Sequence, residues 1–167
     1  MRHSTNTRII VPVIIIEQQC VPLIINDDLE VALASGAAGL HIGQDDGDVR
    51  LIRARLGTGK ILGVSAQTVA QAVDAEASGA DYLGVGSVFP TSTKRDAADV
   101  SLKTLSEICV AVRVPVVAIG GIHAGNARLL AGTGIAGIAV VSALFACPGD
   151  VREAAQRLKA LASEVTT

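Results

Sequence analysis

Two short polar clusters, Asn26-Asp27-Asp28 and Gln44-Asp45-Asp46, each follow a run of mainly apolar residues. If the two runs are neighbouring parallel strands, Asp27 and Asp46 end on the same rim of the sheet. Two carboxylates at one rim could hold a hard cation such as Mg²⁺, which would bridge to a diphosphate. Helix N-capping is the other common use of Asp after a strand, and the residues alone leave both interpretations open.

A loop that combines hydroxyl and cationic side chains is the second candidate. It runs Phe89-Pro90-Thr91-Ser92-Thr93-Lys94-Arg95-Asp96 and lies in the longest interval between the expected strands. Hydroxyls and cations together suit a ligand that bears phosphate. A solvated loop that binds nothing is the alternative interpretation.

Glycine and small residues at two further strand ends suit an anion. Gly120-Gly121 lets backbone N–H groups approach a phosphate closely, and Val140-Val141-Ser142 occupies the corresponding place after the next strand. Helix N-termini after both segments would add favourable partial charge. A tight left-handed turn also calls for glycine, so a purely structural turn is the alternative.

The remaining polar residues give weaker signals. His41 lies inside an expected strand, and we predict that it is a hydrogen-bonded core or lining residue rather than a ligand. Three arginines, Arg50, Arg53 and Arg55, are expected to form a solvated helix face. The sequence carries no local Ser/His/Asp or Cys/His signature, which argues against nucleophilic hydrolysis.

The elements that must position these residues follow from a repeated sequence unit. Ser35–Gln44, Ser78–Ser87 and Thr133–Ser142 each place a glycine suited to a helix C-cap before a short apolar strand. The whole pattern predicts six strands, at Leu23–Asn26, Leu40–Gly43, Ile61–Ser65, Tyr82–Ser87, Val116–Gly120 and Gly137–Ser142.

Capping residues predict the helices between these strands. Thr68, followed three residues later by Gln71, has the pattern of a capping box. We expect helices to begin after Asp28, Asp48, Thr68, Ser101 and Asp150. The last three of these helices are expected to end near Ser78, Val112 and Ser163.

Apolar strands that alternate with helices indicate an α/β protein with a parallel sheet covered by helices. An open doubly wound sheet and a (β/α) barrel both fit. No Gly-x-Gly-x-x-Gly segment follows a strand and opens a helix, whereas polar residues recur at strand carboxyl ends, where a barrel places its active site. We therefore favour a TIM-barrel type, incomplete, with about six βα units plus one N-terminal strand.

The composition of the chain limits the classes of partner that it is expected to bind. The 167 residues suit one domain, and 50% apolar content is enough for a core. A net charge of −2 and 2% aromatic residues argue against nucleic-acid and membrane partners. The apolar run Ile9–Ile16 is too short to span a bilayer and is expected to be a buried strand. Three cysteines without metal-binding spacing indicate a reducing compartment, so we expect a cytoplasmic protein.

Taken together, these segments resemble thiamine phosphate synthase. The similarity extends from about Val21 to Leu158, and its pieces agree with the family in order and spacing. The matching segments are Val21–Asp27, Leu40–Asp46, Gly63–Ser65, Ala80–Gly86, Phe89–Lys94 and Ala118–Ile122.

The resemblance implies a (β/α)₈ barrel and a Mg²⁺-dependent transferase. Its substrates would be two small molecules, 4-amino-2-methyl-5-hydroxymethylpyrimidine diphosphate and a thiazole phosphate. Diphosphate would leave first, and the thiazole nitrogen would attack the resulting pyrimidine methyl cation to give thiamine phosphate.

The resemblance also assigns roles to residues. Asp27 and Asp46 would bind Mg²⁺ as the cofactor. The pyrimidine diphosphate would be contacted by Asn26, Ser65 and Lys94, of which Ser65 and Lys94 would be catalytic. The thiazole phosphate would be held by Thr91, Thr93, the Gly121 backbone, Val141 and Ser142.

Two departures from the family pattern stand out. Ser92 replaces the proline of a Thr-Pro-Thr-Lys segment, which mainly reduces stiffness. The segment 1–20 is atypical, because it lacks a Gln-x-Arg-Glu-Lys-like motif and supplies at most one strand, and we assign 21–167 to the synthase-like domain. Three hypotheses follow: the N-terminal strand covers a sheet edge, a second copy completes the barrel as a homo-oligomer, or the chain is truncated and impaired.

Three alternative functions are open. One is a catalytically impaired, phosphate-binding relative of the synthase. Another is a thiazole tautomerase-like protein, which would use a histidine at the position that Ser87 occupies here. The third is an unrelated barrel enzyme that acts on a sugar phosphate.

Overall fold

Short apolar segments of this chain form one parallel sheet. The computed structural model describes residues 21–91, 100–145 and 149–166. Within these ranges the strands are β1 (Ile24–Asn26), β2 (Gly39–Ile42), β3 (Ile61–Ala66), β4 (Tyr82–Val85), β5 (Val116–Ile119) and β6 (Gly137–Ala139).

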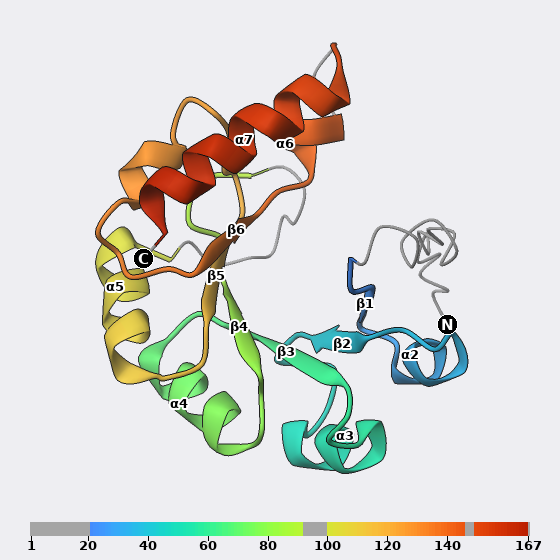
Figure 1. Cartoon of the computed structure of the whole chain (residues 1–167). Coiled ribbons are helices and arrows are strands. Elements are labelled where there is room, and N and C mark those ends of the chain that lie inside the picture. Colours follow the sequence, from blue (N-terminus) through green and yellow to red (C-terminus); the bar gives the residue numbers. More distant parts are fainter. Residues whose placement is uncertain (1–20, 92–99, 146–148, 167) are drawn as a thin grey trace, which may run out of the picture.

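The six strands pair in chain order, and every pair is parallel. Figure 1 shows the sheet curling, with the helices on its outer, convex side. The described strands β1 and β6 each pair on one side and do not pair with each other. The predicted incomplete barrel of parallel βα units is therefore confirmed. The expected strand at Ile9–Ile16 lies outside the described residues.

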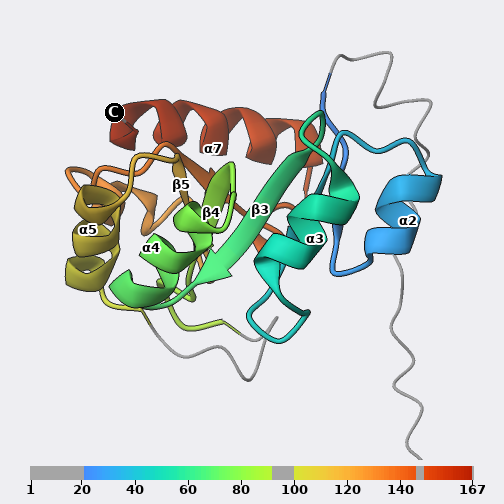
Figure 2. The same ribbon diagram turned by 90° about the horizontal axis from the view of Figure 1, so that it is seen from below.

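Helices connect the strands. They are α2 (Leu29–Ala34), α3 (Val49–Leu56), α4 (Val69–Ala77), α5 (Leu102–Ala111), the short 3₁₀ helix η1 (Ala127–Leu130), α6 (Ser142–Phe145) and α7 (Val151–Val165). Of these, α2, α3, α4, α5 and α7 begin where polar caps predict. The side chains of Asp28, Asp48, Thr68, Ser101 and Asp150 all accept N-capping hydrogen bonds. Thr68 and Gln71 form the predicted capping box. Figure 2 shows α3 and α4 lying over β3.

The two faces of the sheet differ in character. Strand residues that face the helices are large, apolar and almost fully buried, among them Leu40, Ile42, Leu62, Val64, Leu83 and Val85. The alternate residues lie on the inner, concave face of the sheet and are small or polar, as His41, Gly63, Ser65, Tyr82 and Gly84 illustrate. The helix-facing layer supplies the apolar core, and the other face is left for polar chemistry.

Two strands end two or three residues earlier than the pattern predicts, whereas β2 and β5 end one residue early. The prediction extends β4 to Ser87, whereas the strand ends at Val85. Beyond it Val88 N–H still donates to Ile119 O at 3.0 Å, so the chain follows β5 in irregular form. The prediction extends β6 to Ser142, whereas the strand ends at Ala139 and Ser142 is the first residue of α6.

The prediction of a solvated arginine face on α3 is wrong for Arg53. Its side chain is 16% exposed and pairs with Asp81. The guanidinium also donates to three backbone carbonyls, those of Gly57, Lys60 and Gly79. Arg53 therefore ties α3 to the entries of the two following strands. Arg55 is exposed and pairs with Glu30, as expected for a surface residue.

None of the helices in the described ranges is both long and apolar enough to cross a membrane.

Candidate active site at the carboxyl ends of the strands

Because all six strands are parallel, their carboxyl ends share one rim, and the predicted site residues lie along it. Each strand contributes at or just beyond its end. The contributions in strand order are Asn26 and Asp27, Asp46, Ser65, Thr91, Gly121, and Val141 with Ser142. Thr93 and Lys94, predicted for the same rim, lie outside the described residues.

The carboxylates Asp27 and Asp46 follow the neighbouring strands β1 and β2, and both residues are exposed. Asp27 has φ = 65°, a left-handed conformation that Asp tolerates better than most residues, and its N–H donates to His41 O at 2.8 Å. The carboxylate of Asp46 turns back to accept from Gly43 N–H at 2.6 Å. Local backbone geometry thus places both carboxylates at the β1–β2 end of the rim.

Ser65 occupies β3, between these carboxylates and the loops of the later strands. Its Oγ lies 3.0 Å from His41 Nε2. Its carbonyl accepts from Gln44 Nε2 at 2.5 Å. The prediction that His41 is a hydrogen-bonded lining residue is confirmed by this contact and by a second one to Tyr82.

The loop after β4 packs against the glycine turn after β5. Gly121 has φ = 64°, and a Cβ there would lie 2.5 Å from Pro90 O and 2.6 Å from Phe89 O. Any side chain would therefore push the two loops apart. Asn126 fixes the turn further by donating from Nδ2 to Gly121 O at 2.9 Å. Glycine at this position brings the segment that ends in Thr91 beside the end of β5.

The last strand delivers Val141 and Ser142 to the rim, and both are exposed. The carbonyl of Val141 accepts from Leu144 N–H and Phe145 N–H, each at 3.1 Å. These bonds turn the chain directly from the strand into α6, which Ser142 begins.

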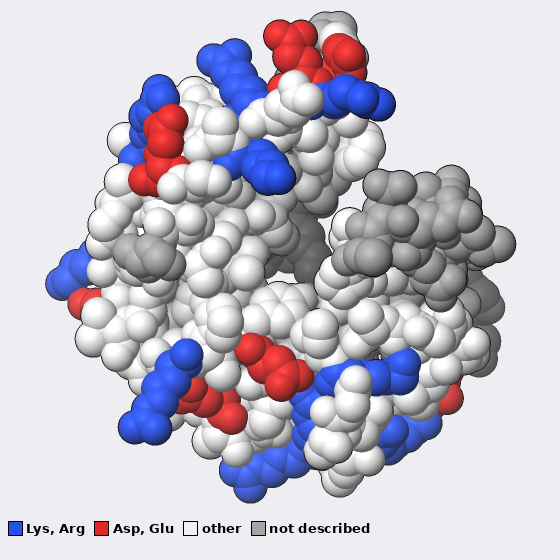
Figure 3. Space-filling view, viewed as in Figure 1, with Lys and Arg blue, Asp and Glu red and all other residues white. Residues whose placement is uncertain are grey.

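On the face seen in Figure 3, charged side chains are dispersed rather than concentrated. Figure 3 shows Lys and Arg, and Asp and Glu, mainly toward the periphery of this face, with neither sign forming a continuous patch. Within the described ranges no group of three or more His, Cys, Asp and Glu residues is arranged to hold a metal ion. A cation at the rim would therefore need ligands from a bound substrate or from water, as well as from the protein.

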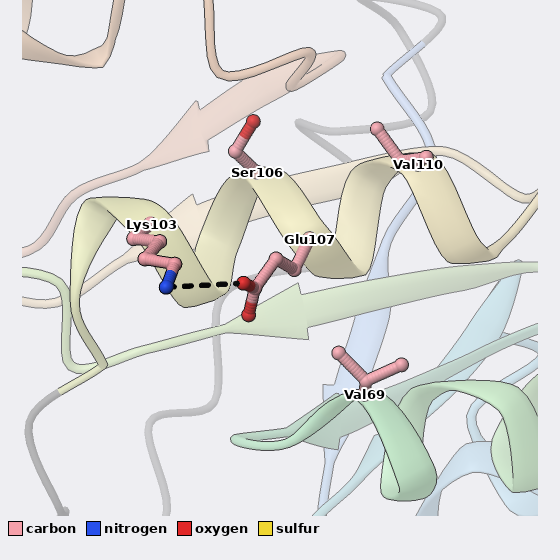
Figure 4. A pocket seen from close by; sticks show the side chains of 5 residues that line it. All are labelled: Val69, Lys103, Ser106, Glu107 and Val110. Carbon is pink, nitrogen blue, oxygen red and sulfur yellow. Dashed lines mark ion pairs between the residues drawn. The ribbon is translucent and has the colours of Figure 1, made fainter.

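A shallow groove lies elsewhere, in the outer helical layer. It is lined by Val69 of α4 and by four residues of α5, namely Lys103, Ser106, Glu107 and Val110 (Figure 4). Lys103 and Glu107 form an exposed ion pair there, 3.8 Å apart. The groove contains none of the predicted site residues.

Tyr82 is a polar residue of the inner face for which the sequence gives no functional signal. Its hydroxyl lies 2.9 Å from His41 Nδ1, and burial raises the pKa of this phenol. The two glycines beneath the ring pair, Gly63 and Gly84, are the sequence feature that could have pointed to it, because they leave an unusual amount of space on one face of the sheet.

The fold and the rim define an α/β protein of barrel type with a polar site at the carboxyl ends of its strands. A family model described as thiamine monophosphate synthase matches residues 9–144. The chain belongs to this family.

Comparisons with individual relatives support this membership. A thiamine-phosphate synthase of Enterococcus faecalis (strain ATCC 700802 / V583) is 57% identical over 125 residues, which are 75% of this chain and 59% of the relative. One of Ruminiclostridium cellulolyticum is 53% identical over 138 residues, which are 83% of this chain and 65% of the relative. The solved thiamine phosphate pyrophosphorylase of Pyrococcus furiosus superposes with a TM-score of 0.82 at 39% identity, over 91% of this chain and 72% of that one. The chain thus spans less than two thirds of the first two relatives.

Proposed function

We propose that the chain catalyses the transfer of a pyrimidinylmethyl group, the pyrimidine ring with its methylene carbon, from diphosphate to the ring nitrogen of a thiazole phosphate. The product would be thiamine phosphate. One observation carries the proposal: the residues assigned to the two substrates and the cation, wherever they are described, lie at or beyond the carboxyl ends of six successive strands, on one rim. Membership of the thiamine monophosphate synthase family supports the same reaction.

The pyrimidine diphosphate would bind at the β1–β3 end of the rim. Asn26 and Ser65 would contact it, with Lys94 from the loop after β4. Support for Ser65 comes from its two hydrogen bonds, which hold both its hydroxyl and its carbonyl in place. An amide and a hydroxyl can donate to phosphate oxygens without adding charge.

The carboxylates suit Mg²⁺ at this end of the rim. Asp27 and Asp46 provide hard oxygen ligands from neighbouring strand ends, and hard oxygen ligands are those that Mg²⁺ prefers. These two residues would hold the ion, with diphosphate and water oxygens completing its coordination. When bound, Mg²⁺ would neutralise charge on the departing diphosphate.

The thiazole phosphate would bind at the β4–β6 end. The Gly121 backbone, Thr91, Val141 and Ser142 would surround it, together with Thr93. The close packing of the Pro90 carbonyl on Gly121 supports this grouping, because it brings the loop with Thr91 next to the β5 turn. Hydroxyls and backbone N–H groups are suitable donors for a dianionic phosphate.

The reaction requires one bond to break and one to form. The bond between the pyrimidine methylene carbon and the diphosphate oxygen breaks, and the diphosphate leaves with the electron pair. The lone pair of the thiazole nitrogen then forms the new carbon–nitrogen bond. The residues of the rim would hold the two substrates in line for this transfer, and Lys94 and Ser65 would stabilise the charge that develops on the leaving group.

Ser87 does not support the tautomerase alternative. It is 4% exposed, and its hydroxyl donates to Phe89 O at 2.8 Å. A small buried hydroxyl engaged in this way offers no imidazole for proton transfer.

The test is formation of thiamine phosphate by the purified chain, given both substrates and Mg²⁺. Asp46→Asn is the informative variant, because an amide oxygen can still accept from Gly43 N–H while the charge is lost. Asp45→Asn, at the exposed neighbouring position, is the matched control. We expect product with the wild type and the control, and a loss of at least about a hundredfold with Asp46→Asn. A folded wild-type chain that binds phosphate but forms no product would refute the transferase and favour the binding-only relative.

A further inference from the structure

Three polar side chains from three strands form a continuous hydrogen-bonded row on the inner face of the sheet. Tyr82 of β4 places its hydroxyl 2.9 Å from His41 Nδ1, and His41 of β2 places Nε2 3.0 Å from Ser65 Oγ of β3. All three residues are half-buried. Ser65 is the end of the row that lies nearest the rim. Tyr82 is the first residue of β4, so it is the end farthest from the rim.

Glycines make the row sterically feasible. His41 and Tyr82 flank Gly63 in the sheet register, so their side chains extend over the same backbone position. A Cβ on Gly63 would lie 2.2 Å from Tyr82 Cζ and 2.4 Å from His41 Nδ1. A Cβ on Gly84 would lie 2.9 Å from His41 Cε1. The backbone under the rings is thus free of side chains where the rings need the space.

The chemistry of the groups gives the row a direction. A phenol is a stronger hydrogen-bond donor than an alkyl hydroxyl, and burial raises the pKa of Tyr82, which keeps its proton in place. When the phenol donates to His41 Nδ1, a neutral imidazole must carry its own hydrogen on Nε2. In that tautomer Nε2–H donates to Ser65 Oγ, and the hydroxyl hydrogen of Ser65 is then directed to another acceptor.

We propose that Tyr82 is a positioning residue, which acts through His41 to make the Ser65 hydroxyl a donor toward an anionic oxygen of the substrate. The kinetic consequence rests on the proposed function, which assigns Ser65 to the pyrimidine diphosphate. The inferred tautomer of His41 does not rest on it, because that inference uses only contacts within the protein.

The first experiment therefore measures the tautomer of His41 by ¹⁵N–¹H NMR of the full chain. Its resonances are assigned among the three histidines by comparison with His41→Gln. We expect hydrogen on Nε2 in the wild type, and a mixture of tautomers in Tyr82→Phe, which removes one oxygen atom and leaves the ring. Hydrogen on Nδ1 in the wild type, or an unchanged tautomer in Tyr82→Phe, would overturn the proposal.

The second experiment is a double-mutant cycle with Ser65→Ala. We expect Tyr82→Phe to lower kcat/KM for the pyrimidine diphosphate about three- to tenfold, the effect of one hydrogen bond, and to leave KM for the thiazole phosphate unchanged. In the Ser65→Ala background the same change should have no further effect. Ser163→Ala, which removes an exposed hydroxyl of α7, is the control. Additive losses would overturn the proposal, and a wild type without activity would refute the proposed function while the NMR result still stands.

Discussion

Asp27 combines two roles that different substitutions can separate. Its left-handed backbone, with φ = 65°, favours Asp, Asn or Gly, and its carboxylate is assigned to the cation. We expect Asp27→Asn to keep the stability of the wild type and lose synthesis, because the backbone is tolerated and the charge is gone. Asp27→Ala should be less stable than Asp27→Asn by about 1 kcal/mol, measured by urea denaturation.

Equal stability of the two variants would show that the backbone at the end of β1 is not strained. Full synthesis by Asp27→Asn would remove this carboxylate from the proposed cation site. The pair of variants therefore reports on backbone and charge independently.

At the scale of elements, the two arginines at the end of α3 offer a matched comparison. Arg53 donates to the carbonyls of Gly57, Lys60 and Gly79 and is mostly buried, whereas Arg55 is exposed. Arg53→Met leaves these carbonyls without that donor, and we expect a loss of about 2–3 kcal/mol in the free energy of unfolding. Arg55→Met should cost no more than about 0.5 kcal/mol. Urea denaturation of both variants checks this, and similar losses would contradict the structural role of Arg53.

The elements also show what local sequence can predict. Strand starts agree with the sequence to within one residue, because glycine caps and apolar runs are local signals. The capping box at Thr68 is equally local. The sequence pattern makes β4 and β6 too long at their carboxyl ends, because an apolar run does not reveal where pairing with a neighbouring strand stops.

The same distinction between local and long-range signals decides which features of the site can be predicted from the sequence. Positions such as Asp27, Ser65 and Gly121 could be placed near strand ends, because the apolar runs of β1, β3 and β5 are local signals in the sequence. The contact of Tyr82 with His41 could not be predicted, because it joins residues 41 apart and depends on both strands being in register with Gly63. The roles assigned to the site residues remain predictions.

At the scale of the molecule, the strands differ in how they are protected. β3 and β4 pair on both sides and bury Leu62, Val64, Leu83 and Val85 against the helices. Among described residues, β1 and β6 each pair on one side. We expect amide hydrogen exchange, followed by mass spectrometry, to be slowest in β3 and β4 and fastest in β1 and β6.

If β1 and β6 were as strongly protected from exchange as β3 and β4, the ranking would be contradicted, and other residues or another molecule would have to cover these two strands. Repeating the exchange over a range of protein concentrations distinguishes the source. Protection that grows with concentration indicates a second copy, as one hypothesis requires.

Tyr82 is the single tyrosine of a chain that contains no tryptophan. Its phenol is hydrogen-bonded to His41, one side chain away from Ser65. The intrinsic ultraviolet fluorescence of the protein therefore comes almost entirely from one ring beneath the rim. Tyr82 is therefore an intrinsic optical reporter. Binding of a substrate that contacts Ser65 would change the fluorescence emission of Tyr82, and no added label would be needed to detect it.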